Sequence, residues 1–266
     1  MNEVVQLGPL ALASDRLLAV GLIMGFVMAL ERIMARTRGD YAGVAALAVG
    51  AGIVAARLVY VAQHHDAYAS DPYSILAVWQ GGFSAPAGLL AAAIVIAWRL
   101  RPRRAMGQAL GALAVAGVLW FTGSALLRPE PRPLPGLPPM TMIDGRPFDM
   151  ENMAGRPMVI NLWATWCPPC RRELPMLADI ASSSTVPVIL VNQGEPAEVV
   201  RNHMLGRGIP TDAILLDSGA DLAQRVAAGG LPTTLFVDGQ GRIVETHVGE
   251  ISRAGLLTGI SELEAR

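Results

Sequence analysis

The stretch Met158-Val-Ile-Asn-Leu-Trp-Ala-Thr-Trp-Cys-Pro-Pro-Cys170, continued by Arg171-Arg-Glu-Leu-Pro-Met-Leu-Ala178, decides the fold of the second half of the chain. It begins as an apolar run typical of a buried strand and ends as an amphipathic helix. The turn between them places Cys167 at a helix N-terminus, where free N–H groups and the helix dipole stabilise a thiolate. Cys170 lies one turn further on, so it can attack a mixed disulfide formed by Cys167.

Composition excludes several classes of protein. The chain has 266 residues, of which 52% are hydrophobic and 16% charged, which is typical neither of a disordered chain nor of an ordinary soluble domain. The net charge of −1 gives no reason to expect nucleic-acid binding. Two cysteines exclude a disulfide scaffold. A zinc site would need His203 and His247, which lack paired spacing, so we expect no metal and no cofactor.

The first half of the chain, residues 1–128, is built of long apolar stretches. A spanning helix needs about 20 mostly apolar residues, and four segments fit this requirement: about 14–33, 42–62, 81–98 and 105–127. Residues 129–139 are rich in proline, which excludes a helix or a central strand and predicts an extended spacer. The sequence therefore predicts a multi-domain chain with a four-helix α transmembrane domain (1–128), a linker (129–139) and a second domain (140–266).

The distribution of arginine predicts the orientation in the membrane. The two loops expected after the first and third spans hold seven arginines, namely Arg32, Arg36, Arg38, Arg99, Arg101, Arg103 and Arg104. The opposite side holds Arg16, Arg128 and Arg132. Because arginine-rich loops stay in the cytoplasm, we expect a multi-pass protein of the cell inner membrane with its N-terminus outside and residues 129–266 in the periplasm.

Arg57 interrupts the second predicted span. A charged side chain inside a membrane usually faces a partner or a polar cavity. An arginine near the end of a span can also extend its head group to the lipid surface. Both interpretations remain open on the sequence alone.

A second motif follows about 60 residues after the cysteines. Gly229-Gly-Leu-Pro-Thr-Thr-Leu-Phe-Val-Asp238 and Gly239-Gln-Gly-Arg-Ile-Val-Glu-Thr-His-Val-Gly249 form a hairpin pattern, and Pro232 stands directly before its first strand. Together with Asn161–Pro175 and Val191-Asn-Gln-Gly-Glu195, this pattern resembles the thioredoxin-like domains of the TlpA/ResA type, which are membrane-bound extracytoplasmic thiol–disulfide oxidoreductases. The resemblance implies an α/β thioredoxin fold. Its expected elements are a hairpin near 141–149, strands 157–163, 186–192, 213–217, 233–238 and 242–248, and helices 168–183, 196–207, 219–227 and 252–264.

The resemblance also implies roles for single residues. Cys167 would be the attacking thiolate, Cys170 the resolving thiol, and the two would form a redox-active disulfide. Asn161 stands where thioredoxin has a buried, proton-accepting Asp, so Glu173 and Glu195 become the candidates for proton transfer and tuning. Pro232 is expected to be cis, as in the thioredoxin fold, and the residues expected to bind substrate are Trp166, Leu231, Pro232 and Thr233. Trp163 is expected in the core.

The first half resembles the beginning of prolipoprotein diacylglyceryl transferase, through Gly8-Pro-Leu10, Ala55–Tyr60 and above all Pro72-Tyr-Ser-Ile-Leu-Ala-Val-Trp-Gln-Gly-Gly-Phe-Ser84. Pro86 occupies the place of a functional His of that family, and the family's later Gly-Arg-x-Gly-Asn-Phe signature is not found. We therefore interpret residues 1–128 as a truncated, degenerate relative that serves as an anchor or binds membrane lipid or a partner.

The first function hypothesis is a membrane-anchored protein-disulfide reductase that acts on extracytoplasmic protein thiols and disulfides. The resemblance makes the cysteines of cytochrome c maturation or of copper sites candidate substrates. Because the chain has no other cysteine, a separate transmembrane electron donor is implied. The alternatives are a disulfide-inserting oxidase, a lipid-binding or lipid-modifying protein with an accessory redox domain, and a binding module without catalysis.

Overall fold

The computed structural model describes residues 4–7, 10–37, 43–127, 129–148, 153, 155–207, 209 and 214–266. The expected boundaries at residues 1, 42, 128, 149 and 213, the charges of Arg38 and Arg128, and residues 8–9 of the transferase-like pattern lie outside these residues. Contacts divide the chain into two compact units. One is a helical unit that holds α1 to α5, and the other is mainly an α/β unit that begins at Pro129 and ends at Arg266.

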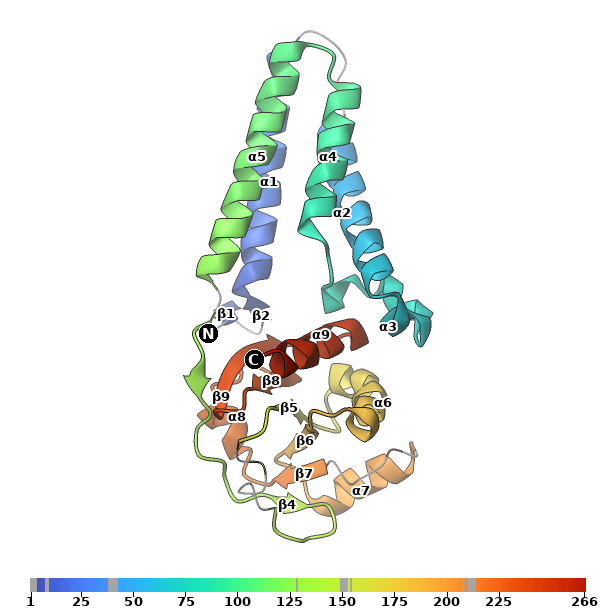
Figure 1. Cartoon of the computed structure of the whole chain (residues 1–266), viewed down its shortest axis with the longest axis vertical. Coiled ribbons are helices and arrows are strands. Elements are labelled where there is room, and N and C mark those ends of the chain that lie inside the picture. Colours follow the sequence, from blue (N-terminus) through green and yellow to red (C-terminus); the bar gives the residue numbers. More distant parts are fainter. Residues whose placement is uncertain are drawn as a thin grey trace. The chain divides into compact units, whose positions relative to one another are not determined.

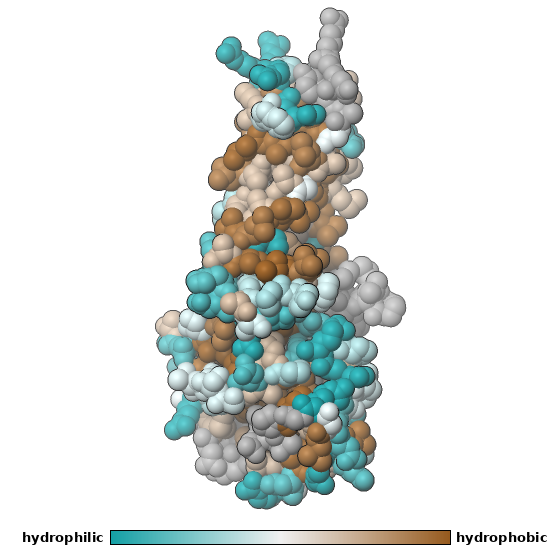
Figure 2. Space-filling view, turned by 90° about the vertical axis from the view of Figure 1, so that its right-hand side faces the viewer, coloured by the Kyte–Doolittle hydropathy of each residue, from teal (hydrophilic) through white to brown (hydrophobic). Residues whose placement is uncertain are grey.

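The helical unit pairs α1 with α5 and α2 with α4 (Figure 1). Its elements are α1 (Ser14–Ala35), α2 (Val44–Gln63), α3 (His65–Ala69), the 3-10 helix η1 (Pro72–Leu76), α4 (Ala85–Arg99) and α5 (Arg103–Leu126). A second 3-10 helix, η2 (Val78–Gln80), falls mostly in the other unit. Two short strands, β1 (Val4–Leu7) and β2 (Leu10–Ala13), precede α1. The surface of the long helices is largely apolar (Figure 2), and α1, α2 and α5 are long and apolar enough to cross a membrane.

The third predicted span differs from the prediction, because α4 has only 15 residues. At 1.5 Å per residue it is about 22 Å long, less than the roughly 30 Å of a hydrocarbon core. The helix starts late because Gly81 and Gly82 have positive φ angles of 80° and 81°. A side chain at Gly82 would also collide with Tyr60, since its Cβ would lie 2.6 Å from the Tyr60 ring.

Arg57 is buried and faces a polar site, the first of the two interpretations of this residue. Its guanidinium donates to the carbonyl oxygens of Ser74 (2.7 Å), Ile75 (3.0 Å) and Gly82 (3.0 Å). The rings of Tyr68 and Phe83 lie 5.3 and 5.6 Å from its central carbon, within cation–π range. Arg57 thus holds the chain between α3 and α4 against α2.

The α/β unit is built on a seven-stranded sheet in the order β3-β9-β8-β5-β6-β7-β4. Strands β5, β6 and β7 are parallel, whereas β8 runs antiparallel to β5, and β9 to β8. The strands are β3 (Arg132–Pro133), β4 (Thr141–Met142), β5 (Met158–Trp163), β6 (Val188–Gln193), β7 (Ile214–Asp217), β8 (Thr233–Val237) and β9 (Arg242–Val248). The helices are α6 (Pro168–Ser183), α7 (Ala197–Leu205), α8 (Asp221–Arg225) and α9 (Arg253–Glu264). This arrangement confirms the predicted thioredoxin fold.

Alternation along the central strands fixes which side chains meet α6. Val159, Trp163 and Phe236 belong to the core that α6, α7 and α9 cover, while Ile160, Leu162 and Leu235 face the opposite core. Because side chains alternate across a strand, Asn161, Thr234 and Asn192 also lie on the α6 face. All three are fully buried, so their polar groups need partners inside that face.

The proline-rich segment is not a free spacer over its whole length. Arg132 and Pro133 form the edge strand β3, antiparallel to β9, and Leu134 N–H donates to the carbonyl of Gly241 (2.9 Å). Leu134 and Leu137 pack against the core on the far side of the sheet from α6. An edge strand tolerates proline because its outer N–H groups need no partner in the sheet. Part of the segment 129–139 therefore belongs to the α/β unit.

Candidate active site

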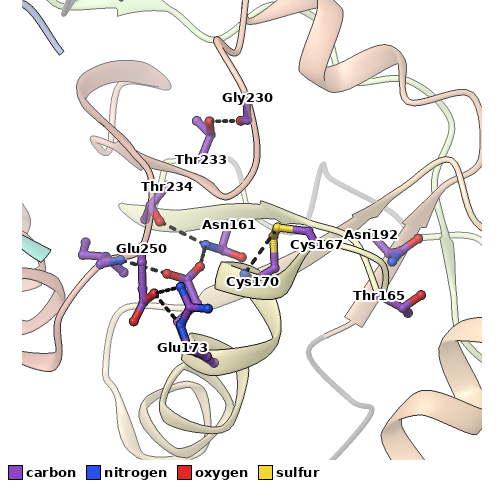
Figure 3. Close-up of a disulfide and its surroundings, with 12 residues drawn as sticks. Asn161, Thr165, Cys167, Cys170, Glu173, Asn192, Gly230, Thr233, Thr234 and Glu250 are labelled. Atoms are coloured by element: carbon purple, nitrogen blue, oxygen red, sulfur yellow. Dashed lines mark hydrogen bonds and ion pairs between the residues drawn. A yellow bond between two sulfur atoms is a disulfide. The ribbon is translucent and has the colours of Figure 1, made fainter. Parts of the chain in front are cut away.

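The two cysteines lie where β5 gives way to α6. Cys167 is the N-cap residue of α6, and Cys170 lies in its first turn. Their sulfurs form a disulfide, with the two Cα atoms 5.3 Å apart (Figure 3). Both side chains are buried. The sulfur of Cys167 therefore lies at the N-terminus of α6, as the local sequence predicts.

The proline spacer limits how many of these N–H groups exist. Pro168 and Pro169 occupy the first two helical positions and have no N–H. The N–H of Cys170 does reach the sulfur, because it donates to Cys167 Sγ at 3.3 Å. Of the first three positions of the helix, only Cys170 thus has an N–H that can donate to the sulfur.

Glu173 lies one turn after Cys170 and is almost completely buried, with 3% of its surface exposed. Its Oε1 accepts from Asn161 Nδ2 (3.0 Å), which also donates to Thr234 Oγ1 (3.0 Å), and its Oε2 accepts from Ile251 N–H (2.8 Å) (Figure 3). Burial raises the pKa of Glu173 from 4.5 to about 8, although both hydrogen bonds act to lower it. Glu173 therefore holds a proton at neutral pH.

Two charged groups lie beside Glu173. Glu250 is buried and forms an ion pair with Arg172, whose Nε and one terminal nitrogen lie 2.9 and 2.6 Å from Glu250 Oε2. The charge of Glu250 adds to the rise of the Glu173 pKa, whereas that of Arg172 opposes it. The sequence reasoning did not single out Glu250 or Arg172.

The loop before β8 contains Pro232, which is expected to be cis. The Leu231–Pro232 peptide bond is cis. Thr233 Oγ1 donates to the carbonyl of Gly230 (2.7 Å), and the carbonyl of Pro232 accepts from Gly249 N–H (2.9 Å). These bonds fix the loop to β8 and to the end of β9.

The two tryptophans at the site have different environments. Trp163 is fully buried in the core, as expected, whereas Trp166 is 67% exposed. An indole that stays in water directly before Cys167 offers an apolar surface to another molecule.

Glu195 is a hydrogen-bond acceptor for the turn that precedes Cys167. Its Oε2 accepts from Thr165 N–H (2.6 Å) and from Asn192 Nδ2 (2.7 Å), and its Oε1 accepts a short hydrogen bond from Thr165 Oγ1. The carboxylate thus ties the end of β6 to the turn between β5 and α6. This geometry supports a role in positioning the turn, and Thr165 and Asn192 are further partners that the sequence reasoning missed.

Removing the Glu195 carboxylate is expected to destabilise the α/β unit. Glu195→Ala leaves the buried amide of Asn192 and the partly buried donors of Thr165 without an acceptor, which costs about 1–3 kcal/mol. Glu195→Gln should lose less, because its amide oxygen can still accept from Thr165 N–H. Urea unfolding of the full chain in detergent, followed by tryptophan fluorescence, measures both. Glu198→Ala, which removes an exposed acid from α7, is the control, and an equal loss there would contradict the assignment.

A signal for the missed residues exists in the topology. The carboxyl ends of the parallel strands β5 and β6 meet at one edge of the sheet, so polar residues at or just after these ends, such as Thr165, Asn192 and Glu195, can be expected to cluster. Glu250 follows β9 and gives no such signal. Among the described residues, no group of three or more His, Cys, Asp or Glu could hold a metal ion.

Both parts of the chain are similar to known protein families. Residues 136–260 match the family model Redoxin, and residues 4–128 match that of prolipoprotein diacylglyceryl transferase. A thiol:disulfide interchange protein DsbE homolog of Paracoccus denitrificans (strain Pd 1222) is 32% identical over 148 residues, which are 52% of this chain and 82% of that protein. The thiol-disulfide oxidoreductase ResA of Bacillus thuringiensis (strain Al Hakam) is 26% identical over 120 residues, covering 44% of this chain and 69% of ResA.

Among solved structures, a thioredoxin family thiol:disulfide interchange protein from Chlorobium tepidum TLS is similar to this chain. The match has a TM-score of 0.43 and 24% identity, and it covers 51% of this chain and 97% of that one. The identity to the Paracoccus relative, over most of its length, decides the assignment. This chain belongs to the DsbE-like family of thiol:disulfide interchange proteins and is a thiol–disulfide oxidoreductase.

Proposed function

We propose that this protein is a membrane-anchored, extracytoplasmic protein-disulfide reductase in which Cys167 attacks and Cys170 resolves. One observation carries the direction of the reaction. Because Pro168 and Pro169 have no N–H, the Cys167 sulfur accepts a single hydrogen bond from the start of α6, that of Cys170 N–H. Weaker stabilisation of the thiolate favours the reduced form less, and a pair whose reduced form is less favoured is a stronger reductant.

The reaction begins with the reduced pair. The Cys167 thiolate attacks one sulfur of a substrate disulfide, and the other substrate sulfur leaves as a thiolate that takes a proton from water. Cys170 then loses its proton and attacks Cys167 Sγ, which forms the Cys167–Cys170 disulfide and releases the second substrate thiolate, which is protonated in turn. Two electrons have then passed from the cysteine pair to the substrate.

Glu173 is the proposed acceptor of the proton of Cys170. Asn161 cannot take up a proton, and Glu173 lies one turn from Cys170 on the same helix. With a pKa of about 8 in the oxidised form, close to the ordinary thiol pKa of about 8.5, Glu173 can take the proton of Cys170 in the chains in which its carboxyl group is ionised, and transfer between the two groups is nearly balanced. The structure holds the disulfide, and in this state Glu173 keeps the proton at neutral pH, as expected after the transfer.

The substrate segment is proposed to bind beside the disulfide, at the loop of Leu231, Pro232 and Thr233. Main-chain pairing with such a loop gives affinity for an extended peptide without demanding a particular sequence. The exposed Trp166, which directly precedes Cys167 in the sequence, is proposed to supply an apolar contact. Protein thiols and disulfides are therefore the proposed substrate class, with cysteines of cytochrome c maturation or of copper sites as candidates by family resemblance.

The helical unit is proposed to anchor the chain in the inner membrane. Its apolar helices α1, α2 and α5 have spanning length, and α4 would complete a four-helix set that returns the chain to its starting side. The arginines between α1 and α2 and around the start of α5 favour a cytoplasmic location of these ends, which places the α/β unit in the periplasm. Electrons would come from a separate transmembrane donor, and the transferase-like unit would contact membrane lipid.

The reduction potential of the cysteine pair tests the proposal. The full chain in detergent holds two cysteines, so equilibration with glutathione reports one couple. We expect a potential below about −220 mV, which marks a reductant that needs a dedicated donor. A potential near −120 mV, the range of strong oxidants, would instead make the protein a disulfide-inserting oxidase.

A further inference from the structure

The short loop between β9 and α9, residues 249–252, joins the two halves of the active site. Gly249 N–H donates to the carbonyl of Pro232, and Ile251 N–H donates to Glu173 Oε2. Ser252 ends the loop by capping α9, since its Oγ accepts from Gly255 N–H (3.1 Å). The loop is therefore held at both ends while its centre lies on the Glu173 carboxyl group.

The centre of this loop is held by charge. Glu250 directly precedes Ile251, its side chain is 7% exposed, and both hydrogen bonds from Arg172 go to one oxygen, Oε2. Arg172 directly precedes Glu173 on α6. The ion pair thus joins the neighbour of Glu173 on α6 to the neighbour of Ile251 in the loop. It acts directly beside the hydrogen bond from Ile251 N–H to the Glu173 carboxyl group. Figure 3 shows Glu250 beside Glu173, on the same side of the disulfide.

We propose that Glu250 and Arg172 are positioning residues of the redox site, which together hold the loop 249–252 across Glu173 and set whether Glu173 carries a proton. This inference rests on the proposed role of Glu173 in catalysis. Neither residue touches the sulfurs in this assignment, and each acts through Glu173.

The charges that face Glu173 come from two elements. Arg172 belongs to α6 and Glu250 to the loop before α9, and these are the charged groups that act on Glu173 in the part of the chain that the structure describes. Strands β5 and β8 contribute the uncharged Asn161 and Thr234. The ring of His247, near the end of β9, lies with Nε2 3.3 Å from the carbonyl oxygen of Glu250. Arg253 of α9 is paired with Asp179.

The two partners must therefore shift the titration of Glu173 in opposite directions. Glu250→Gln removes a like charge that disfavours ionisation of Glu173, but it keeps an oxygen that can accept from Arg172, so the loop stays across Glu173 and the midpoint should fall by about one pH unit. Arg172→Gln removes the opposite charge and leaves Glu250 unpaired, so the midpoint should rise by a similar amount. Glu250→Gln keeps the length of the side chain, and Arg172→Gln changes a side chain that is 55% exposed. We therefore expect both variants to fold.

The experiment titrates the oxidised full chain in detergent by infrared spectroscopy. The carboxyl band of Glu173 is assigned by its loss in Glu173→Gln and is followed with pH in each variant. Circular dichroism confirms that each variant folds. Arg171→Gln is the matched control, since it removes the same charge one residue earlier on α6. The charge of Arg171 acts on His203 and is not among those that act on Glu173.

Opposite shifts in the two variants, with none in Arg171→Gln, support the proposal. An unchanged midpoint in Glu250→Gln, or shifts of equal direction in both variants, overturns it. Because the oxidised chain is titrated without substrate, this result is independent of the reduction potential. A failed reductase assignment and a failed assignment of Glu250 and Arg172 can thus be told apart.

Discussion

The reduced Cys170→Ser variant is expected to stop halfway through the reaction, joined covalently to its substrate. Cys167 keeps its place at the start of α6 and still attacks a disulfide, but no thiol is left to release the product. Steady-state turnover should therefore fall by on the order of a thousandfold or more, as when other covalent catalysts lose a reacting group. The mixed disulfide should accumulate as one adduct per chain.

Mass spectrometry under non-reducing conditions detects this adduct after the full chain is mixed with a peptide disulfide. Cys167→Ser is the matched variant, because it removes the other sulfur of the pair by the same change. It should show neither turnover nor rapid adduct formation, since the remaining sulfur lies within α6 and lacks the N-cap position. Faster adduct formation in Cys167→Ser than in Cys170→Ser would reverse the proposed roles.

The stability of the α/β unit is expected to fall as pH rises through the neutral range, because of Glu173. Its pKa is about 8 in the folded chain against 4.5 as the ordinary value. Between these values the unfolded chain loses a proton that the folded chain keeps, so the free energy of unfolding decreases by about 1.4 kcal/mol per pH unit. The contribution is fully present below pH 4.5, and its loss reaches about 5 kcal/mol above the folded pKa.

Glu173→Gln removes this slope, because an amide does not titrate. The variant should be less stable than the wild type near pH 4.5. A Gln side chain has only one oxygen, so its NH2 group must face either Ile251 N–H or Asn161 Nδ2, and that donor loses its acceptor. The difference should shrink or reverse by pH 8. Urea unfolding of the oxidised full chain at several pH values measures it, and parallel slopes for wild type and variant would show that Glu173 titrates near its ordinary value.

The resemblance to thioredoxin-like domains predicted the elements of the α/β unit well. The expected helix 168–183 coincides with α6, and the expected strand 157–163 differs from β5 by one residue. Around the cysteines a buried apolar run and amphipathic spacing, which are properties of neighbouring residues, point to the same strand and helix. The helix expected at 219–227 is shorter, since α8 covers Asp221–Arg225.

Two features of the first 139 residues depended on more than local pattern. Residues 81–98 are apolar enough to be predicted as a membrane span. The positive φ angles of Gly81 and Gly82, however, delay the start of α4 to Ala85. Proline content marked 129–139 as extended, but the pairing of β3 with β9 depends on a strand more than 100 residues away in the sequence.

The sequence by itself determined the thioredoxin fold and the place of Cys167 and Cys170 at the start of a helix, because they belong to a short motif whose local geometry is strongly constrained. Its resemblance to thioredoxin-like domains also named Pro232 and Glu173 as candidate residues of the site. Only the tertiary structure decided what these residues touch. Glu173 meets Ile251 and lies near Glu250 after a separation of more than 70 residues, and Glu195 reaches back 30 residues to Thr165. Such contacts arise when strands and helices pack, and a buried carboxyl group takes its pKa from the groups that packing brings to it.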